Sequence, residues 1–292
     1  MLAQLLANGI IAGCATALVA FGFALIYNTT RTFHFAHGAV YISSFYLFYS
    51  LHQLTAPIWL CIALVLPLSA LLGVAIDELV YRPLIQRNSS SLVRLLSSLG
   101  VYIIIVNAIP MFWGNEVKVF STTLQPTVSF DRITLSRIQV ITAGSCFVIF
   151  AALAFLLRMT RLGKLFRAMR DDPDLLSTLG VNPRNVRAYA FALGSLLAGL
   201  AAILKGLDVG IDPNSGMAVF LSAAIAVIIA GIGIFEGVIL ASLLVAVLQS
   251  IAIWKLSAQW QDMTTFILLI LFLLVRPQGV FGSRKRMEEL AG

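Results

Sequence analysis

The chain has 292 residues, of which 60% are hydrophobic and 11% are charged, and its mean hydropathy is +0.95. Soluble domains carry roughly 25% charged residues, so this composition excludes a soluble enzyme or binding domain and indicates an integral membrane protein. The net charge of +7 does not require a nucleic-acid partner, because basic loops beside anionic membrane lipid account for it.

The chain contains nine apolar runs that we interpret as membrane spans, since a helix needs about 20 apolar residues to cross the hydrocarbon. Lipid offers no partner to a free backbone group, so each run should be helical. The sequence therefore predicts an all-α integral membrane protein, a polytopic bundle of about eight or nine transmembrane helices in a single domain over residues 1–292. The expected spans lie near residues 4–27, 38–55, 58–80, 95–113, 138–157, 188–207, 217–235, 238–254 and 260–275.

Glycine and proline interrupt several of these runs. Pro57, Pro67 and Pro110 each mark a place where a helix could bend or break. Two Gly-marked breaks, in residues 33–41 (FHFAHGAVY) and 231–240 (GIGIFEGVIL), each open into an apolar helix, one in each half of the chain. Matched interruptions predict an internal repeat with a pathway between its halves, built from broken or re-entrant helices. The alternative is that both breaks are ordinary cytoplasmic turns.

We expect the two breaks to line the substrate pathway. In the first, aromatic rings and imidazoles would line or gate the path, and small residues would allow close backbone approach. His34 and His37 could hold a metal, but no third Cys or acidic ligand is near in sequence; hydrogen bonds that pack helices are the alternative. The candidate residues are Phe33, His34, Phe35, Ala36, His37 and Gly38 in the first break, and Gly231, Gly233 and Glu236 in the second.

The loop over residues 114–137 is richer in Val, Ile, Thr and Phe than an ordinary polar loop. Its segments VKVFSTT and TVSFDRITLSRIQV alternate partially, and Gln125 and Pro126 separate them. This pattern predicts a small hairpin outside the membrane. The hairpin would either contact an external delivery protein or form a lid without a partner of its own.

Residues 158–187 hold seven of the 20 Lys and Arg residues and lie between apolar runs. Basic residues favour the cytoplasmic side of a membrane. With the spans above, 15 basic residues fall on this side and five on the other. We therefore expect the N-terminus outside and the C-terminus in the cytoplasm.

Within this loop a short helix carries its own start and stop signals. Asp172 is the expected N-cap, Pro173 the first-turn residue, Asp174 an acid near the helix N-terminus, and Gly180 the C-terminal cap. Such a helix on the inner face has the shape of a knob that docks into a soluble partner. The alternative is that the segment only covers the bundle against water.

Apolar side chains of this helix would contact the soluble partner, and charged side chains would set the register. The apolar residues are Leu175, Leu176 and Leu179, and the charged residues are Arg167, Arg170, Asp171 and Asp174.

The chain contains no GxxxxGK(S/T) phosphate loop, and each cytoplasmic segment is too short for an ATPase domain, so any ATP-driven engine must be another polypeptide. Away from the span ends the ionisable candidates are few: His34, His37, Asp77 and Glu78. Ion-driven carriers usually keep buried acids at their centre. The sequence therefore favours a transporter driven by a separate ATPase over an ion-coupled secondary carrier. A nucleophile paired with a base is also lacking, so we expect no enzyme activity and no cofactor in this chain.

Four blocks in order resemble the branched-chain amino-acid and urea permeases of bacterial ABC importers. They are residues 8–47, ELVYRPL at 78–84, residues 160–204 and RPQGVFG at 276–282. The resemblance implies a permease subunit of the bacterial cytoplasmic (inner) membrane that carries a small polar solute inward by alternating access. It also implies partners: a second permease, related or identical, two cytoplasmic ATPase subunits that bind ATP and Mg²⁺, and an external solute-binding protein.

The chain departs from the family pattern at both breaks. Phe33 and His34 stand where the family usually has Ile-Asn before FAHG. Where the family usually has Gly-Gly-Ile-Gly followed by a small residue, this chain has AGIG at residues 230–233 followed by Ile234, Phe235 and Glu236. Both replacements are bulkier. The cargo therefore need not be an ordinary branched-chain amino acid; another amino acid, urea or an amide would also suit a permease of this kind.

Charged residues at the outer end of the sixth span bear on the same question. Lys205, Asp208 and Asp212 could meet the two ends of a zwitterion. The alternative is an interfacial charge cluster, because charged side chains near span ends reach water cheaply.

Overall fold

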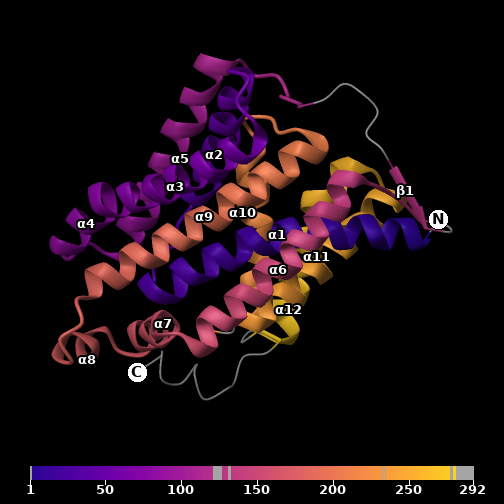
Figure 1. The fold of residues 1–292 in the computed structure, drawn as a ribbon. Helices are drawn as coiled ribbons and strands as arrows, with labels where there is room; N and C mark the ends of the chain where they lie inside the picture. The colour runs from indigo at the N-terminus through magenta and orange to yellow at the C-terminus, as the bar shows by residue number, and fades with distance from the viewer. Residues whose placement is uncertain are drawn as a thin grey trace.

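The computed structural model describes residues 2–120, 127–130, 133–231, 233, 235–276 and 279–280. It is a bundle of helices with one small hairpin (Figure 1). The helices are α1 (Leu2–Thr30), α2 (Ala36–Gln53), α3 (Ile58–Ile76), α4 (Arg82–Gln86), α5 (Ser91–Trp113), α6 (Arg137–Met159), α7 (Arg161–Asp171), α8 (Pro173–Thr178), α9 (Pro183–Val209), α10 (Gly216–Ala230), α11 (Phe235–Lys255) and α12 (Gln261–Val275).

Each of the nine expected spans corresponds to one of these helices, so the prediction of an all-α polytopic membrane protein is confirmed. Six helices among the described residues are long and apolar enough to cross a bilayer, and α10 and most of α12 are shorter apolar helices. Large apolar side chains such as Leu71, Ile104 and Phe147 are exposed on the outside of the bundle, as expected where lipid is the solvent.

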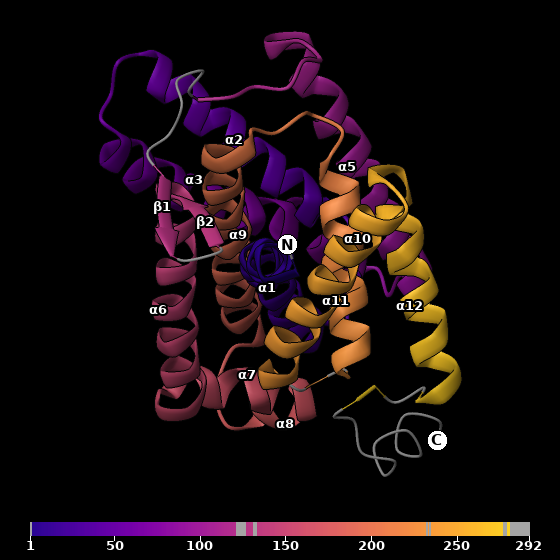
Figure 2. The same cartoon turned by 90° about the vertical axis from the view of Figure 1, so that its right-hand side faces the viewer.

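Helix α1 forms the centre of the bundle. Figure 2 shows it end-on, surrounded by α6, α9, α10 and α11, all of which contact it. Its middle turns are fully buried, because small and aliphatic side chains such as Ala17, Leu18 and Ala20 let the neighbouring helices pack closely. Of the three cysteines, Cys61 and Cys146 are buried and Cys14 is partly buried, and all three are free thiols.

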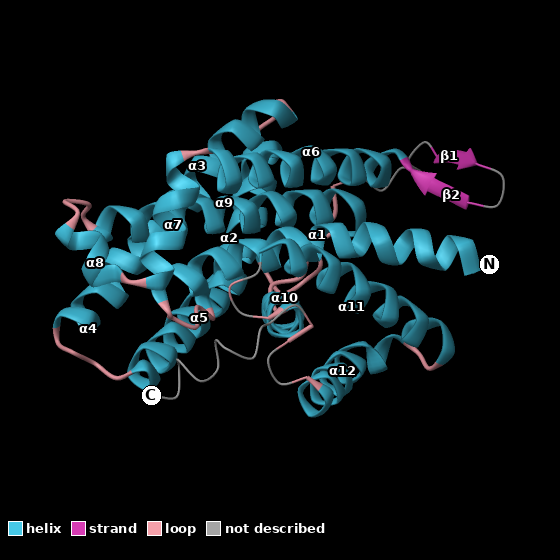
Figure 3. Ribbon diagram, turned by 90° about the horizontal axis from the view of Figure 1, so that it is seen from below, coloured by secondary structure: helices cyan, strands magenta, loops and turns pink. Residues whose placement is uncertain are grey.

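The two ends of the bundle differ. Figure 3 shows the hairpin and the start of α1 at one end, and α4, α7 and α8 at the other. We call these the hairpin end and the α8 end.

The prolines interrupt the helices less than expected. Pro57 is the N-cap of α3, but Pro67 and Pro110 lie inside α3 and α5, which continue across them. Of the two possibilities for these prolines, a bend or a break, the break does not occur, since a membrane helix can satisfy the freed carbonyl in other ways. The irregular turn lies elsewhere: α3 continues directly into η1, a π-helical turn over Asp77–Tyr81, and then into α4.

The hairpin is built differently from the expectation. Strands β1 (Thr127–Phe130) and β2 (Ile133–Ser136) pair antiparallel, so both come from the second of the two predicted segments. In the first segment, Lys118 instead pairs with Ile211 in an isolated bridge beside α9. The side chain of Gln4 binds the backbone of Thr134 through two hydrogen bonds, at 2.7 and 2.8 Å, which fixes the hairpin to α1.

Candidate functional site

The first break is a non-helical segment, residues 31–35, that turns back along α1. Arg31 starts it with a φ of 52°. The ring of Phe33 then lies against Phe23 and Tyr27 of α1, with centroid distances of 5.1 and 6.0 Å. The segment therefore runs back beside the last two turns of α1, and apart from the exposed Arg31 it lies inside the bundle.

Both histidines of this break are fully buried and hydrogen-bonded to other helices. His34 Nδ1 lies 2.7 Å from the Tyr81 hydroxyl of η1, and His37 Nε2 lies 3.2 Å from the Val19 carbonyl oxygen of α1. These bonds match the helix-packing alternative. Among the described residues no three His, Cys, Asp or Glu side chains come together as a metal site.

The aromatic residues of the break form a cluster with α10. The rings of Phe33, Phe35 and Phe23 all surround Phe220, at centroid distances of 5.8, 5.1 and 5.2 Å. Phe220 was not predicted, because its only signal would be contact with a segment almost 190 positions earlier. Phe33 and Phe35 thus pack against α10, and Phe33 also packs against α1.

Gly38 brings α2 close to α10, as the small residue predicted. A Cβ on Gly38 would lie 2.6 Å from the carbonyl oxygen of Gly216, too close for any other residue type without a shift of the helices. Ala36, also buried, donates its backbone N–H to the Ser98 hydroxyl of α5 at 3.2 Å. The first break and the start of α2 therefore contact α1, η1, α5, α9 and α10.

The second break separates α10 from α11. Gly231 and Gly233 have φ values of 100° and 95°, which favour glycine. The carbonyl oxygen of Gly233 accepts a hydrogen bond from Arg170 Nη1 at 2.9 Å. Ile232 and Ile234 lie outside the described residues, and Glu236 lies in the first turn of α11 with its side chain also outside the described part.

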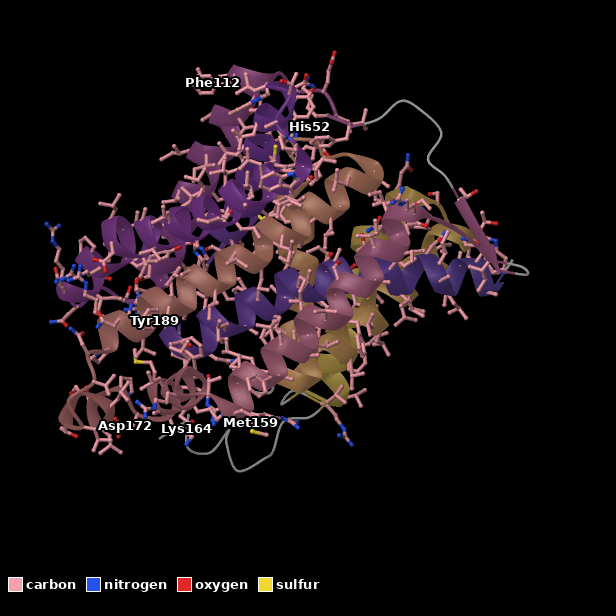
Figure 4. All side chains as sticks on the ribbon, viewed as in Figure 1. His52, Phe112, Met159, Lys164, Asp172 and Tyr189 are labelled. Atoms are coloured by element: carbon pink, nitrogen blue, oxygen red, sulfur yellow. The ribbon has the colours of Figure 1, made fainter. Side chains whose placement is uncertain are left out.

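The capped helix is confirmed as α8. Asp172 Oδ1 accepts hydrogen bonds from the backbone N–H groups of Asp174 and Leu175, both at 2.9 Å, and Pro173 is the first helical residue. Gly180 follows the helix with a φ of 80°. Figure 4 places Asp172 with Lys164 and Met159 at the edge of the bundle where α6 ends and α7 and α8 lie.

The side chains expected to meet a partner divide into two groups. Leu175 and Leu179 are 57% and 73% exposed, but Leu176 is only 3% exposed and packs in the protein's own core. The expectation that Leu176 offers contact to a partner is therefore wrong. Arg167 also points inward, because its guanidinium binds the carbonyl oxygen of Leu157.

An ion-pair network lies at the start of α9, directly after α8. The Asp77 carboxylate of η1 pairs with Arg187; the Asp77 side chain is buried, at 3% exposed, and the Arg187 side chain is partly buried, at 14% exposed. Glu78 pairs with Arg184 at 2.8 Å and with Arg82 at 2.6 Å. The acids were noticed in the sequence, but their partners were missed; the spacing of three between the two arginines on one helix face was the available signal.

The three charged residues at or just after the C-terminal end of α9 do not form one cluster. Lys205 and Asp208 line the same cavity, whereas Asp212 lies beyond α9 and accepts a hydrogen bond from the backbone N–H of Asn214 at 2.8 Å.

The sequence of the chain is similar to known proteins over nearly its whole length. A sequence model of the family described as the permease component of branched-chain amino acid transport systems matches residues 5–275. The chain is 31% identical to the high-affinity branched-chain amino acid transport system permease protein BraD of Pseudomonas aeruginosa, over 98% of this chain and 97% of that protein. It is 28% identical to the corresponding permease LivH of Escherichia coli, with the same coverage.

More distant matches agree. A probable branched-chain amino acid transport permease of Methanocaldococcus jannaschii is 24% identical over 98% of this chain and 95% of that protein. Among solved structures, PsaBC from Streptococcus pneumoniae in complex with Fab superposes with a TM-score of 0.52 at 12% identity, over 98% of this chain and 94% of that chain. The latter shows a shared fold.

Proposed function

The chain belongs to the family of branched-chain amino acid transport permeases, and we propose that it is the membrane-spanning subunit of an ABC importer that carries an amino acid into the cytoplasm by alternating access. Its partners are a second permease subunit, two cytoplasmic ATPase subunits that bind ATP and Mg²⁺, and an external solute-binding protein. The α8 end faces the cytoplasm, in accord with the excess of Lys and Arg on that side.

The ATPase subunits contact α8. Leu175 of α8 and Leu179, which directly follows the helix, offer the exposed apolar surface, and the exposed Asp171 and Asp174 lie near them in the sequence. Leu176 has a different role, because it packs in the core and fixes α8 to the rest of the bundle. A displacement of α8 by the ATPase subunits therefore moves the bundle and does not only bend the loop.

A displacement of α8 reaches both breaks through hydrogen bonds and ion pairs. On one side Arg170, the residue before the acidic pair that leads into α8, binds the Gly233 carbonyl of the second break. On the other side Arg187 pairs with Asp77 of η1, and η1 carries Tyr81, whose hydroxyl binds His34 of the first break. The observation that carries the proposal is the Arg170–Gly233 bond, because it joins the α7–α8 segment to a predicted pathway element in one step.

Reconstitution tests the proposal. We expect the permease, assembled with its ATPase subunits and binding protein in proteoliposomes, to accumulate radiolabelled L-leucine or another amino acid only when ATP is present on the α8 side. Uptake that proceeds without ATP but follows a proton or sodium gradient would identify a secondary carrier and overturn the proposal. Urea and acetamide in parallel assays decide between amino acids and amides as cargo.

A further inference from the structure

A cavity of about 320 Å³ lies between α1, α2, α6, α9 and α10, with one residue each of α11 and α12 in its lining. Its wall on α1 is a continuous helical stripe that runs from the hairpin end to the middle of the helix, about 16 Å at 1.5 Å per residue. The stripe consists of Asn8, Ile11, Ala12, Ala15, Thr16 and Val19. Ligand pockets begin at about 300 Å³, so this volume suits one small solute.

Opposite charges line the cavity on α9. The carboxylate of Asp208 is half-buried and is held by long hydrogen bonds, at 3.4 Å each, from the Ser136 hydroxyl and the Gln139 amide. Lys205, one turn away on the same helix, lines the cavity too and is more exposed. A carboxylate and an ammonium group this close in sequence on one helix face can meet the ammonium and the carboxylate of an α-amino acid.

Two buried hydroxyls also line the cavity. Tyr41 on α2 is 1% exposed and Thr142 on α6 is 4% exposed, and neither hydroxyl has a hydrogen-bond partner among the described residues. Buried hydroxyls in native proteins are normally bonded, so both are available to the polar atoms of a solute. Ile11, Leu204 and Val219 supply an apolar wall for an aliphatic side chain.

The inner end of the cavity meets the first break. Val19 lines the cavity, and its carbonyl oxygen holds His37 Nε2 at 3.2 Å. A solute in the cavity is therefore separated from the FHFAHG segment by one residue of α1.

We propose that this cavity is a binding site for a zwitterionic α-amino acid within the permease, at which Asp208 binds the ammonium group, Lys205 binds the carboxylate, and the hydroxyls of Tyr41 and Thr142 bind remaining polar atoms. The inference rests on the proposed function, since it names the site at which the transported solute is received.

Equilibrium binding of tritiated L-leucine to the complete permease–ATPase complex, without the external binding protein, tests this site. We expect saturable binding that Asp208→Asn and Lys205→Gln each weaken at least tenfold. The matched control is Asp212→Asn, which lies outside the cavity and should bind as the parent does. L-Leucinamide, which lacks the carboxylate, should compete poorly against the parent, and Lys205→Gln should reduce that discrimination.

Tyr41→Phe keeps the test decisive if a charge variant fails to assemble, because the removed hydroxyl bonds no described residue. It should weaken leucine binding several-fold while the complex stays intact. Unchanged binding in Asp208→Asn, Lys205→Gln and Tyr41→Phe would overturn the inference, as would a complex that imports leucine with its binding protein but binds none without it. A complex that imports no amino acid under either condition would instead count against the proposed function.

Discussion

Arg170 on α7 donates a hydrogen bond from Nη1 to the carbonyl oxygen of Gly233 at 2.9 Å. The same guanidinium binds the Asp171 carboxylate through Nε at 2.8 Å, and the arginine side chain is only 13% exposed. Gly233 lies between α10 and α11 with a positive φ, and the arginine provides a hydrogen bond to its carbonyl oxygen. We expect any movement of α7 to act on the turn between α10 and α11.

Replacing Arg170 by Gln should separate ATP hydrolysis from transport. The shorter neutral side chain cannot hold the Gly233 carbonyl, and coupling terms of this kind are about 1–3 kcal/mol. We expect L-leucine uptake to fall by about tenfold while ATP hydrolysis continues, both measured on the same proteoliposomes. Lys164→Gln, an exposed change on the same helix, is the control; an equal loss in that variant would show a general effect of charge.

The leucines of α8 should behave in opposite ways. The double variant Leu175→Asp, Leu179→Asp places charges on an exposed surface. The permease should therefore insert and melt normally but lose its ATPase subunits on co-purification. Leu176→Ala instead opens a cavity in the core and should cost about 2–5 kcal/mol of stability, seen as a lower melting temperature. If Leu176→Ala is harmless and the exposed double variant unfolds, the assignment of the two faces is wrong.

The ion pair between Asp77 and Arg187 should matter more for stability than the pairs of Glu78. Removing one partner of a buried pair typically costs about 3–5 kcal/mol, whereas partly exposed pairs contribute about 0–1 kcal/mol. Asp77→Asn should therefore lower the melting temperature clearly, and Glu78→Gln should leave it nearly unchanged. Equal melting temperatures for the two variants would contradict the burial of Asp77 against α9.

Interactions between residues close in the sequence could be predicted from residue type, but interactions between residues far apart in the sequence could not. Asp172, Pro173 and Gly180 act within one short helix, so residue type alone predicted both of its ends. The inward turn of Leu176 could not be predicted, because six helical residues with two adjacent leucines do not define which face meets the core. Packing against the rest of the bundle decides that face.

The contacts at the two breaks could not be predicted either, because they also join residues far apart in the sequence. The sequence indicated where the chain breaks, since Gly and His-rich segments interrupt apolar runs. Their partners Tyr81, Phe220 and Arg170 lie 47 or more positions away from the residues that they contact, and nothing in residue type or spacing joins them. The π-helical turn that presents Tyr81 has no sequence signal that we could have used.

His34 and Tyr81 should act as one unit. His34→Asn keeps a side chain able to bond the Tyr81 hydroxyl, so we expect a folded permease with an altered uptake rate or preference among amino acids. In a double-mutant cycle, Tyr81→Phe should cost about 1 kcal/mol in the parent and much less in His34→Ala, because the bond is already lost. Additive losses in melting temperature would show that the two side chains are independent, and unchanged uptake in His34→Asn would reduce the first break to a packing element.

The orientation of the chain can be tested with engineered thiols and an impermeant maleimide. Glu116→Cys, on an exposed segment toward the hairpin end, should be labelled in intact cells, because this side faces outward if basic residues mark the cytoplasm. Thr178→Cys, exposed on α8, should be labelled only after the inner membrane is opened. Cys61 and Cys146 are buried and Cys14 is partly buried, so the parent chain should give a low background in both conditions. Labelling of position 178 in intact cells would place α8 outside the cell, beyond the reach of any cytoplasmic ATPase, and would remove the basis for treating it as a coupling helix.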